Sequence, residues 1–241
     1  MTETTFLEEY DPEIYRRPSV TVDLVLLGLS GNRLTALLGQ RTEHPHAGKW
    51  ALPGGFVYID EALDDAALRV LREKVGIDHA HFEQLYTFGA VDRDPRMRII
   101  TVAYLALMTE AAFADALAHA PHLTPASVDM SGVGVRARAV TVVAKDGERL
   151  SLAFDHADIL ATAILRLRGK LDYSDVGFAF LPPRFTLRRL QDVHEAISGG
   201  PVNKSAFRRR MIDKGWIVPT GTRETATAFR PAELFRFERQ F

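Results

Sequence analysis

Cysteine is absent from the 241-residue chain, which excludes disulfides and thiolate metal sites and suits a reducing compartment. Long hydrophobic runs are also missing, because no apolar stretch approaches the roughly 20 residues that a membrane-spanning helix requires. Residues 1–15 are acidic and polar and do not follow the basic-then-apolar pattern of a secretory signal. These absences predict a cytoplasmic globular protein with no membrane partner.

A strong excess of charge of one sign is lacking as well, since the net charge is −1. The charges are nevertheless divided unevenly along the chain. Residues 172–241 hold 12 basic and 8 acidic side chains, whereas residues 1–171 hold 18 basic and 23 acidic ones. No internal repeat or low-complexity tract is evident. The pattern predicts a small basic C-terminal part joined to a larger acidic part.

One stretch organises the larger part. Gly54 and Gly55 open a loop, Asp60 is suited to cap a helix N-terminus, and Gly76 is suited to end that helix after Val75. Apolar residues between these signals recur at the spacing of one helical face: Leu63, Ala66, Ala67, Val70 and Leu71. The pattern predicts an amphipathic helix behind a glycine turn.

Strands and helices alternate around this helix. We expect strands at 19–29, 34–42, 82–91 and 99–108, and a hairpin of residues 135–143 and 149–154 around the turn 145–147. Helices are expected at 110–120 and 156–171, and a polar loop at 122–132. Mixed strands with helices on both faces predict an α/β fold, a three-layer α/β/α sandwich, over residues 1–171. Residues 1–17 are expected to form a loosely ordered arm.

The C-terminal part has the element order of a winged helix-turn-helix. Residues 173–183 read as a linker that ends in a proline pair. Helices are then expected at 187–197 and 203–214, with a glycine turn at 198–201 between them, and a strand, a turn and a strand at 216–218, 219–228 and 229–237. We therefore expect residues 172–241 to form a winged helix-turn-helix domain that binds double-stranded DNA.

The second helix of this domain has a cationic outer face. Helical spacing turns Phe207 and Met211 toward the packed side. The side chains expected to meet DNA are Lys204, Ser205, Arg208 and Arg209, with Arg223 on the wing. The alternative interpretation is a solvated basic helix in a small packing domain.

Within the larger part, the spacing of Gly55, Glu61, Arg69, Gly76 and Ile77 resembles the Nudix box, and the lead-in at 50–55 is also Nudix-like. In active members of that family the helix carries several glutamates that bind Mg²⁺ or Mn²⁺ and act on a diphosphate. In this chain the resemblance does not extend to the glutamates that bind the metal. Val70 and Lys74 stand where the family has glutamates, so that Glu61 and Glu73 are vestigial. We therefore expect no metal, no other cofactor and no catalytic residues.

Residues 92–98, which carry three arginines, resemble a loop of the Nudix subset that acts on ADP-ribose-like compounds. A guanidinium group matches a phosphate with two hydrogen bonds. The predicted effector-binding residues are Arg41, Gly54, Gly55, Asp94, Arg96 and Arg98. The alternatives are a solvated charged loop and, for Arg41, a surface salt bridge. His156 is expected to cap or pack rather than to catalyse.

A degenerate Nudix domain followed by a winged helix resembles the Nudix-related transcriptional regulators. That resemblance implies a dimeric bacterial repressor, cytoplasmic, whose Nudix domain senses ADP-ribose or a related nucleotide. It also implies control of NAD-metabolism genes, although some relatives govern sugar catabolism. The homodimer is expected to form through the acidic part, because the basic part must face DNA. Two alternatives stay open: an active hydrolase of ADP-ribose or a related nucleoside diphosphate derivative, and an inactive scaffold that binds a protein partner.

Overall fold

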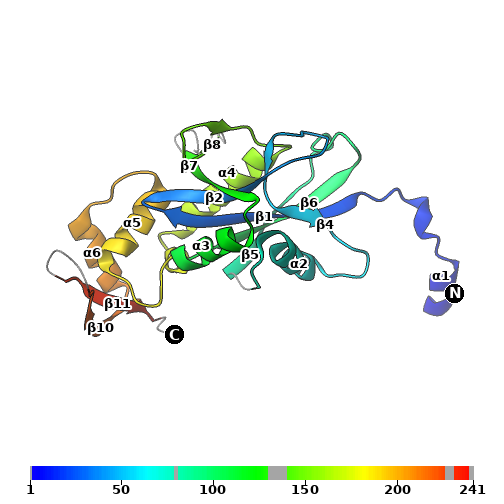
Figure 1. The fold of residues 1–241 in the computed structure, drawn as a ribbon. Helices are drawn as coiled ribbons and strands as arrows, with labels where there is room; N and C mark the ends of the chain where they lie inside the picture. Colours follow the sequence, from blue (N-terminus) through cyan, green and yellow to red (C-terminus); the bar gives the residue numbers. More distant parts are fainter. Residues whose placement is uncertain (1, 79–80, 130–139, 226–230, 239–241) are drawn as a thin grey trace.

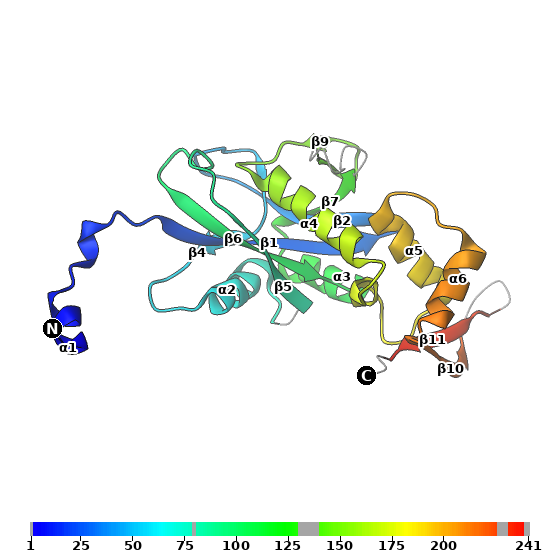
Figure 2. The same ribbon diagram turned by 180° about the vertical axis from the view of Figure 1, so that it is seen from behind.

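A computed structural model describes residues 2–78, 81–129, 140–225 and 231–238. A mixed sheet forms the middle of the molecule, with helices on both of its faces (Figures 1 and 2). In chain order the elements are α1 (Glu3–Glu9), η1 (Pro12–Ile14), β1 (Ser19–Ser30), β2 (Arg33–Gln40), β3 (Trp50–Ala51), β4 (Gly54–Phe56), α2 (Leu63–Val75), β5 (His81–Phe88), β6 (Ile99–Leu107), α3 (Glu110–His119), β7 (Leu123–Asp129), β8 (Thr141–Val143), β9 (Arg149–Leu150), α4 (His156–Lys170), η2 (Val176–Phe180), α5 (Leu187–Ser198), α6 (Lys204–Asp213), β10 (Ile217–Arg223) and β11 (Glu233–Phe237). The predicted α/β/α sandwich is confirmed. No helix in the described part of the chain is both long and apolar enough to span a membrane.

The central strand β1 explains the layering. It pairs in parallel with β6 and antiparallel with β2 and β4, and the sheet order is β5-β6-β1-β2-β7-β8-β9. Successive side chains of a strand point to opposite faces. Leu24 and Leu26 accordingly pack with α2 and α3, whereas Val25 and Leu27 pack with α4. Burial on both faces accounts for the almost continuous apolar run in this strand.

The helix after the glycine loop begins later than predicted. Its N-cap is Ala62, which has no side-chain capping bond, so the assignment of Asp60 as the cap is wrong. The carboxylate of Glu61 accepts from the Tyr58 N–H at 2.7 Å and holds the preceding residues in a turn. Four of the five predicted apolar positions are buried, and Leu63 is 37% exposed. Gly76 ends the helix in the left-handed region, at φ 75°, as predicted.

The predicted polar loop at 122–132 is also wrong over residues 123–129, which form β7 and pair with β2 at residues 123–127. Residues 130–132 of that predicted loop lie outside the described part. Buried side chains recur at alternate or near-alternate positions of β7, at Leu123, Ala126 and Val128. The Thr and Pro residues between them obscure this alternation in the sequence. Pro125 lies opposite Leu37 of β2, whereas the described pairing of β7 with β8 covers residues 127–129. Pro125 therefore lies where β7 is an edge strand, a position that tolerates proline. The hairpin of β8 and β9 is present, whereas residues 135–139 of its predicted first strand lie outside the described part.

The predicted linker at residues 173–183 has secondary structure of its own. It contains the short helix η2, whose Val176 and Phe180 are buried. The reason is aromatic packing: the ring of Phe178 lies 5.7 Å from that of Phe185 and 4.4 Å from that of Phe237. One hydrophobic core therefore runs from the sheet through α4 into the C-terminal elements.

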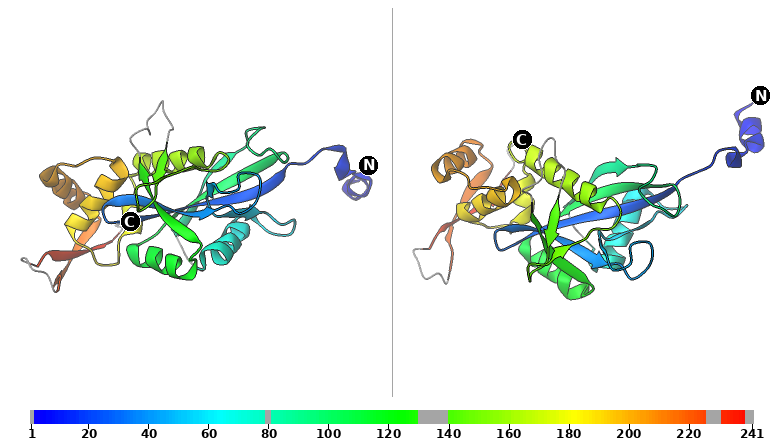
Figure 3. Two further views of the ribbon diagram at one scale, coloured as in Figure 1. Left: turned by 45° about the horizontal axis from the view of Figure 1, so that its top comes forward. Right: turned by 90° about the horizontal axis from the view of Figure 1, so that it is seen from above.

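The C-terminal elements follow the predicted order of helix, turn, helix, strand and strand. Gly199 ends α5 at φ 81°, and the Asn203 side chain caps α6 by accepting from the Ala206 N–H at 2.9 Å. The predicted turn at 219–228 begins too early, because β10 continues to Arg223 against β11. Residues 226–230 lie outside the described part. Figure 3 shows α6 and these strands at one end of the molecule and the arm with α1 at the other.

Candidate ligand pocket and nucleic-acid interface

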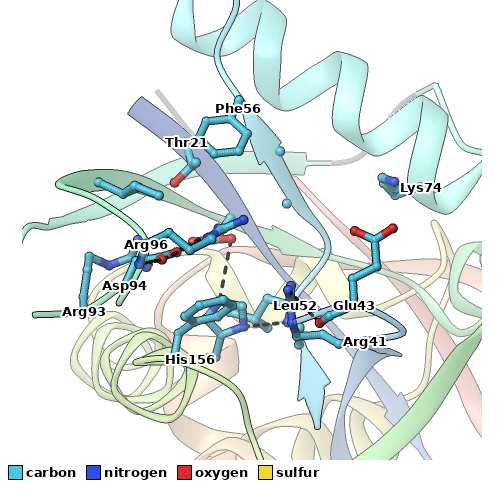
Figure 4. A pocket seen from close by; sticks show the side chains of 16 residues that line it. Thr21, Arg41, Glu43, Leu52, Phe56, Lys74, Arg93, Asp94, Arg96 and His156 are labelled. Carbon is cyan, nitrogen blue, oxygen red and sulfur yellow. Dashed lines mark hydrogen bonds and ion pairs between the residues drawn. The ribbon is translucent and has the colours of Figure 1, made fainter. Parts of the chain in front are cut away.

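A pocket of about 400 Å³ lies where the loop after β2, the strand β4, the loop 92–98 and the start of α4 meet (Figure 4). Of the predicted effector residues, Arg41, Gly54, Gly55, Asp94 and Arg96 line it. The structure therefore brings together residues from three separate parts of the sequence. Arg98 is not among the described lining residues; its guanidinium donates to the Ala90 carbonyl at 2.9 Å.

The glycines shape one wall because β4 lies so close to β1. Asp23 faces Gly54 and Val22 faces Gly55 in the antiparallel register. A Cβ on Gly54 would come within 2.3 Å of the Asp23 carboxylate and 2.7 Å of the Val22 carbonyl. A Cβ on Gly55 would lie 3.1 Å from Val70. The first glycine is therefore needed for this close approach.

A buried ion network forms the floor. The Arg93 guanidinium donates to both carboxylate oxygens of Asp155, at 2.8 and 2.7 Å, and lies 3.6 Å from Asp23. Thr101 donates to the same Asp23 carboxylate at 2.7 Å. Burial lowers the pKa of Arg93, but its hydrogen bonds to Asp155 and the negative charges of Asp155 and Asp23 outweigh burial and raise that pKa above its ordinary value. Arg93 stays charged and ties loop 92–98 to α4 and β1.

His156 begins α4 and is buried beside this network. Its Nδ1 accepts from the Leu52 N–H at 2.9 Å (Figure 4). Its Nε2 lies 3.9 Å from Asp23. Burial lowers the pKa of His156, so the imidazole is neutral, with its proton on the Nε2 that faces Asp23. The ring holds the Leu52 backbone in place, which agrees with the predicted packing role.

The two predicted arginines at the pocket are held differently. Arg96 donates to both carboxylate oxygens of Asp94, at 3.0 and 2.8 Å, and these hydrogen bonds lower the pKa of Asp94. Arg41 donates to two backbone carbonyls, those of Pro45 at 2.9 Å and Glu43 at 3.3 Å. Its guanidinium lies 4.9 Å from the ring centre of Phe154. Arg41 is thus oriented by two backbone carbonyls and an aromatic ring.

The remaining carboxylates of the Nudix-like box are engaged by Arg69. This side chain binds Glu61 at 2.6 and 3.0 Å and Glu73 at 3.3 Å, and its hydrogen bonds lower the pKa of Glu61. Val70 is buried against Gly55, and Lys74 lines the pocket. No group of three or more His, Cys, Asp or Glu suited to a metal ion occurs within the described ranges. The residues present do not fit the divalent metal of an active Nudix box.

Several lining residues were not predicted as site residues: Asp23, Glu43, Lys74, Arg93, Phe154 and His156. One signal was available for Asp23, because it is the only charged residue in an otherwise apolar strand and such a residue requires a partner. Asp155, which holds Arg93, offers no comparable signal. It acts only through a residue 62 positions away.

At the other end of the molecule, the cationic face of α6 points outward, as predicted. Phe207 and Met211 are buried, whereas Lys204, Ser205, Arg208 and Arg209 are exposed. Arg209 lies 3.6 Å from Asp213, and Arg223 is exposed on β10 and donates to the Pro231 carbonyl. Arg210 instead points back to the body, where its guanidinium lies 3.3 Å from Asp172. The outer face of α6 is therefore cationic and open to a partner.

Replacing Arg93 with alanine is expected to lower the free energy of unfolding by about 3–5 kcal/mol, because the buried Asp23 and the half-buried Asp155 lose their counter-charge. Urea denaturation of the full chain measures the change. The matched control is Arg72→Ala, because the Arg72 side chain is 56% exposed and lies 3.6 Å from Asp78. That control should cost less than about 1 kcal/mol. Equal losses for the two variants would contradict the assigned role of the network.

Comparisons with known proteins match both the Nudix-like part and the winged-helix part of the chain. The family description "NUDIX domain" matches residues 17–123, and "NrtR DNA-binding winged helix domain" matches residues 177–237. The ADPR responsive transcriptional repressor NtrR of Acinetobacter baylyi is 37% identical over 241 residues, which cover 99% of this chain and 90% of that protein. The crystal structure of Shewanella oneidensis NrtR complexed with a 27mer DNA is 35% identical, with a TM-score of 0.74 over 91% of this chain and 93% of that one.

The NUDIX domain of the same Shewanella protein, in a cocrystal structure with ADP ribose, is 33% identical, with a TM-score of 0.51. The match covers 69% of this chain and 99% of that chain. The likeness thus extends over the pocket domain alone as well as over the two domains together. The chain belongs to the NrtR family, in which a Nudix domain precedes a C-terminal winged helix DNA-binding domain.

Proposed function

We propose that this protein is a bacterial transcriptional repressor that is released from its operator by ADP-ribose, and that it controls genes of NAD metabolism. The observation that carries the proposal is the similarity over almost the entire chain to a repressor named as ADPR responsive. In our assignment, residues 1–171 bind the effector and dimerise, and residues 172–241 bind DNA. The protein works in the cytoplasm.

The pocket is suited to a nucleotide in size and charge. Its volume of about 400 Å³ lies within the range of small-molecule sites. Arg41 and Arg96 present guanidinium groups that can bind a diphosphate, and Gly54 and Gly55 let the ligand approach the backbone of β4. Asp94 holds Arg96 in position. Arg98 contributes by fixing loop 92–98 through the Ala90 carbonyl.

The proposed DNA interface is the outer face of α6. In this proposal, Arg208, Arg209 and Ser205 reach base edges in the major groove, and Lys204 and Arg223 contact phosphates. A single module of this kind buries only about 600–1,000 Å² on DNA. We therefore infer a homodimer on a near-palindromic operator, formed through the acidic domain.

The helix α4 connects the two sites. At its N-terminal end, His156 and the adjacent Asp155 belong to the pocket network. Near its C-terminal end, Arg168 donates to the Ile197 carbonyl of α5 at 3.1 Å, and just beyond it Asp172 pairs with Arg210 of α6. A ligand that displaces the start of α4 therefore acts on the element against which α5 packs, and α6 packs in turn on α5. The ligand can shift the equilibrium between the DNA-bound and the released protein only by the difference in its affinity for these two forms.

We further infer that the protein has no hydrolase activity. Its relative from Acinetobacter baylyi is a repressor. In this chain the carboxylates of Glu61 and Glu73 are bound by Arg69, and Val70 and Lys74 supply no metal ligand. A diphosphate hydrolysis that depends on a divalent cation lacks its coordinating oxygens here.

Incubation of the full chain with ADP-ribose and Mg²⁺ or Mn²⁺ is expected to leave the nucleotide intact, because the metal ligands are missing. The reaction is measured as the release of AMP, which is detected by chromatography. A turnover of about 1 s⁻¹ or faster, which is typical of working enzymes, would establish the hydrolase instead.

Replacing Arg208 or Arg209 with alanine is expected to weaken operator binding by about 1–3 kcal/mol if the side chain contacts a base. A phosphate contact would weaken all sequences alike and flatten the salt dependence. Fluorescence anisotropy with operator and scrambled duplexes distinguishes the two. Arg72→Ala, which removes one positive charge from α2, is the matched control. Unchanged affinity of the double variant, with its circular dichroism intact, would refute the interface.

Addition of operator is expected to weaken the binding of ADP-ribose, because linkage requires two opposed ligands to reduce each other's affinity by the same factor. Calorimetric titration of ADP-ribose with and without saturating operator measures the two dissociation constants. If they agree within error while both ligands bind, ADP-ribose is not the effector.

A further inference from the structure

Four cationic side chains line the pocket, and they divide into two pairs. Arg93 and Arg96 are neutralised, by Asp155 and Asp94 respectively. Arg41 and Lys74 have no carboxylate oxygen within 4.0 Å in the part of the chain that the structure describes. The positive charge of the last two is therefore available to an anion.

Arg41 and Lys74 also lie at the junction of two cavities. Both line the main pocket, and both line an adjoining cavity of about 360 Å³ that extends toward His122. They approach from different elements, Arg41 after β2 and Lys74 from the last turn of α2 (Figure 4). An anion held at this junction would meet both cations and would still have space on either side for the rest of a nucleotide.

Among the described residues, this region presents no cluster of carboxylates that could bind a metal ion in place of these two cations. The carboxylates of Glu61 and Glu73 are held by Arg69, and Val70 is buried beneath Gly55. Two phosphate groups brought into the pocket nevertheless need counter-charge as they lose water. In this chain that charge has to come from side chains.

We propose that the Lys74 ammonium, together with the Arg41 guanidinium, binds the diphosphate of the nucleotide in place of a divalent cation, so that ligand binding needs no metal. The inference rests on the proposed function of the pocket as an ADP-ribose site. The two groups are complementary, because the planar guanidinium of Arg41 is suited to two hydrogen bonds with one phosphate and the ammonium of Lys74 acts as a point charge.

Glu43 opposes the ligand in this arrangement. Its carboxylate lies on the same side of the pocket as Lys74 (Figure 4), and it lines both cavities. A diphosphate that approaches Lys74 therefore meets one negative charge. Removing that charge should strengthen binding, which is the opposite of the effect expected for Lys74.

A structural role for Lys74 is the competing explanation. Basic residues in the last turn stabilise a helix through its dipole, and both Arg72 and Lys74 lie in the last turn of α2. Arg72 does not line the pocket and lies 3.6 Å from Asp78. Arg72→Gln is therefore the matched control, because it removes one positive charge from the same turn.

The test is calorimetric titration of ADP-ribose into the full chain, in EDTA and then in Mg²⁺. The wild type is expected to bind equally well in both. Lys74→Gln should weaken binding about tenfold or more, which is the scale of a lost charged hydrogen bond. Lys74→Arg should retain most of the affinity, Arg72→Gln should match the wild type, and Glu43→Gln should bind more tightly. Thermal unfolding of each variant checks that it is folded.

Two results would overturn the inference: binding by the wild type that is lost in EDTA and restored by Mg²⁺, or Lys74→Gln affinity equal to that of the wild type. Either result leaves ADP-ribose as the ligand and removes only the role of Lys74. Absence of ADP-ribose binding by the wild type in both buffers would instead overturn the proposed function, and the inference with it.

Discussion

The buried ion pair between Arg93 and Asp155 is the interaction on which the pocket depends. It joins three segments that are distant in sequence, because Arg93 lies in loop 92–98, Asp155 precedes α4, and Asp23 lies in the central strand β1. A buried charge is costly unless its partners replace the lost water, and here each group has them. Because both sides of the pair are needed, loop 92–98 and the start of α4 are held against the sheet together.

Through this arrangement, the ligand pocket is connected by α4 to the C-terminal domain. Helix α4 belongs to the pocket at one end and contacts α5 at the other, and a single hydrophobic core encloses its buried face. An additional ion pair joins Arg189 of α5 to Glu110 of α3. A domain that shares a core with its neighbour cannot reorient freely, so a change at the pocket has to be accommodated by repacking along α4. That is a physical basis for the proposed coupling between ADP-ribose and DNA.

The Nudix-like helix α2 is held in the fold by packing contacts that need no metal. Ala66, Ala67, Val70 and Leu71 bury one face against the sheet, and the bond of Arg69 to Glu61 holds the preceding turn. Each of these contacts supports the fold rather than a metal. Val70 even contributes to the wall, because it lies directly under Gly55. The helix is thus held by its packing, and Lys74, which stands where the Nudix box has a glutamate, lines the pocket.

Local patterns in the sequence determined much of this protein. The apolar run of β1, the left-handed glycine after α2 and the outward face of α6 follow from side-chain periodicity and backbone sterics, which act over a few residues. The missing glutamates at Val70 and Lys74 are equally visible. Tertiary structure alone decided the rest. It pairs Arg93 with Asp155, makes a strand of β7 against an available edge, and buries η2 through aromatic contacts. These features depend on partners dozens of residues away, and no local spacing records which partner a chain will meet when it folds.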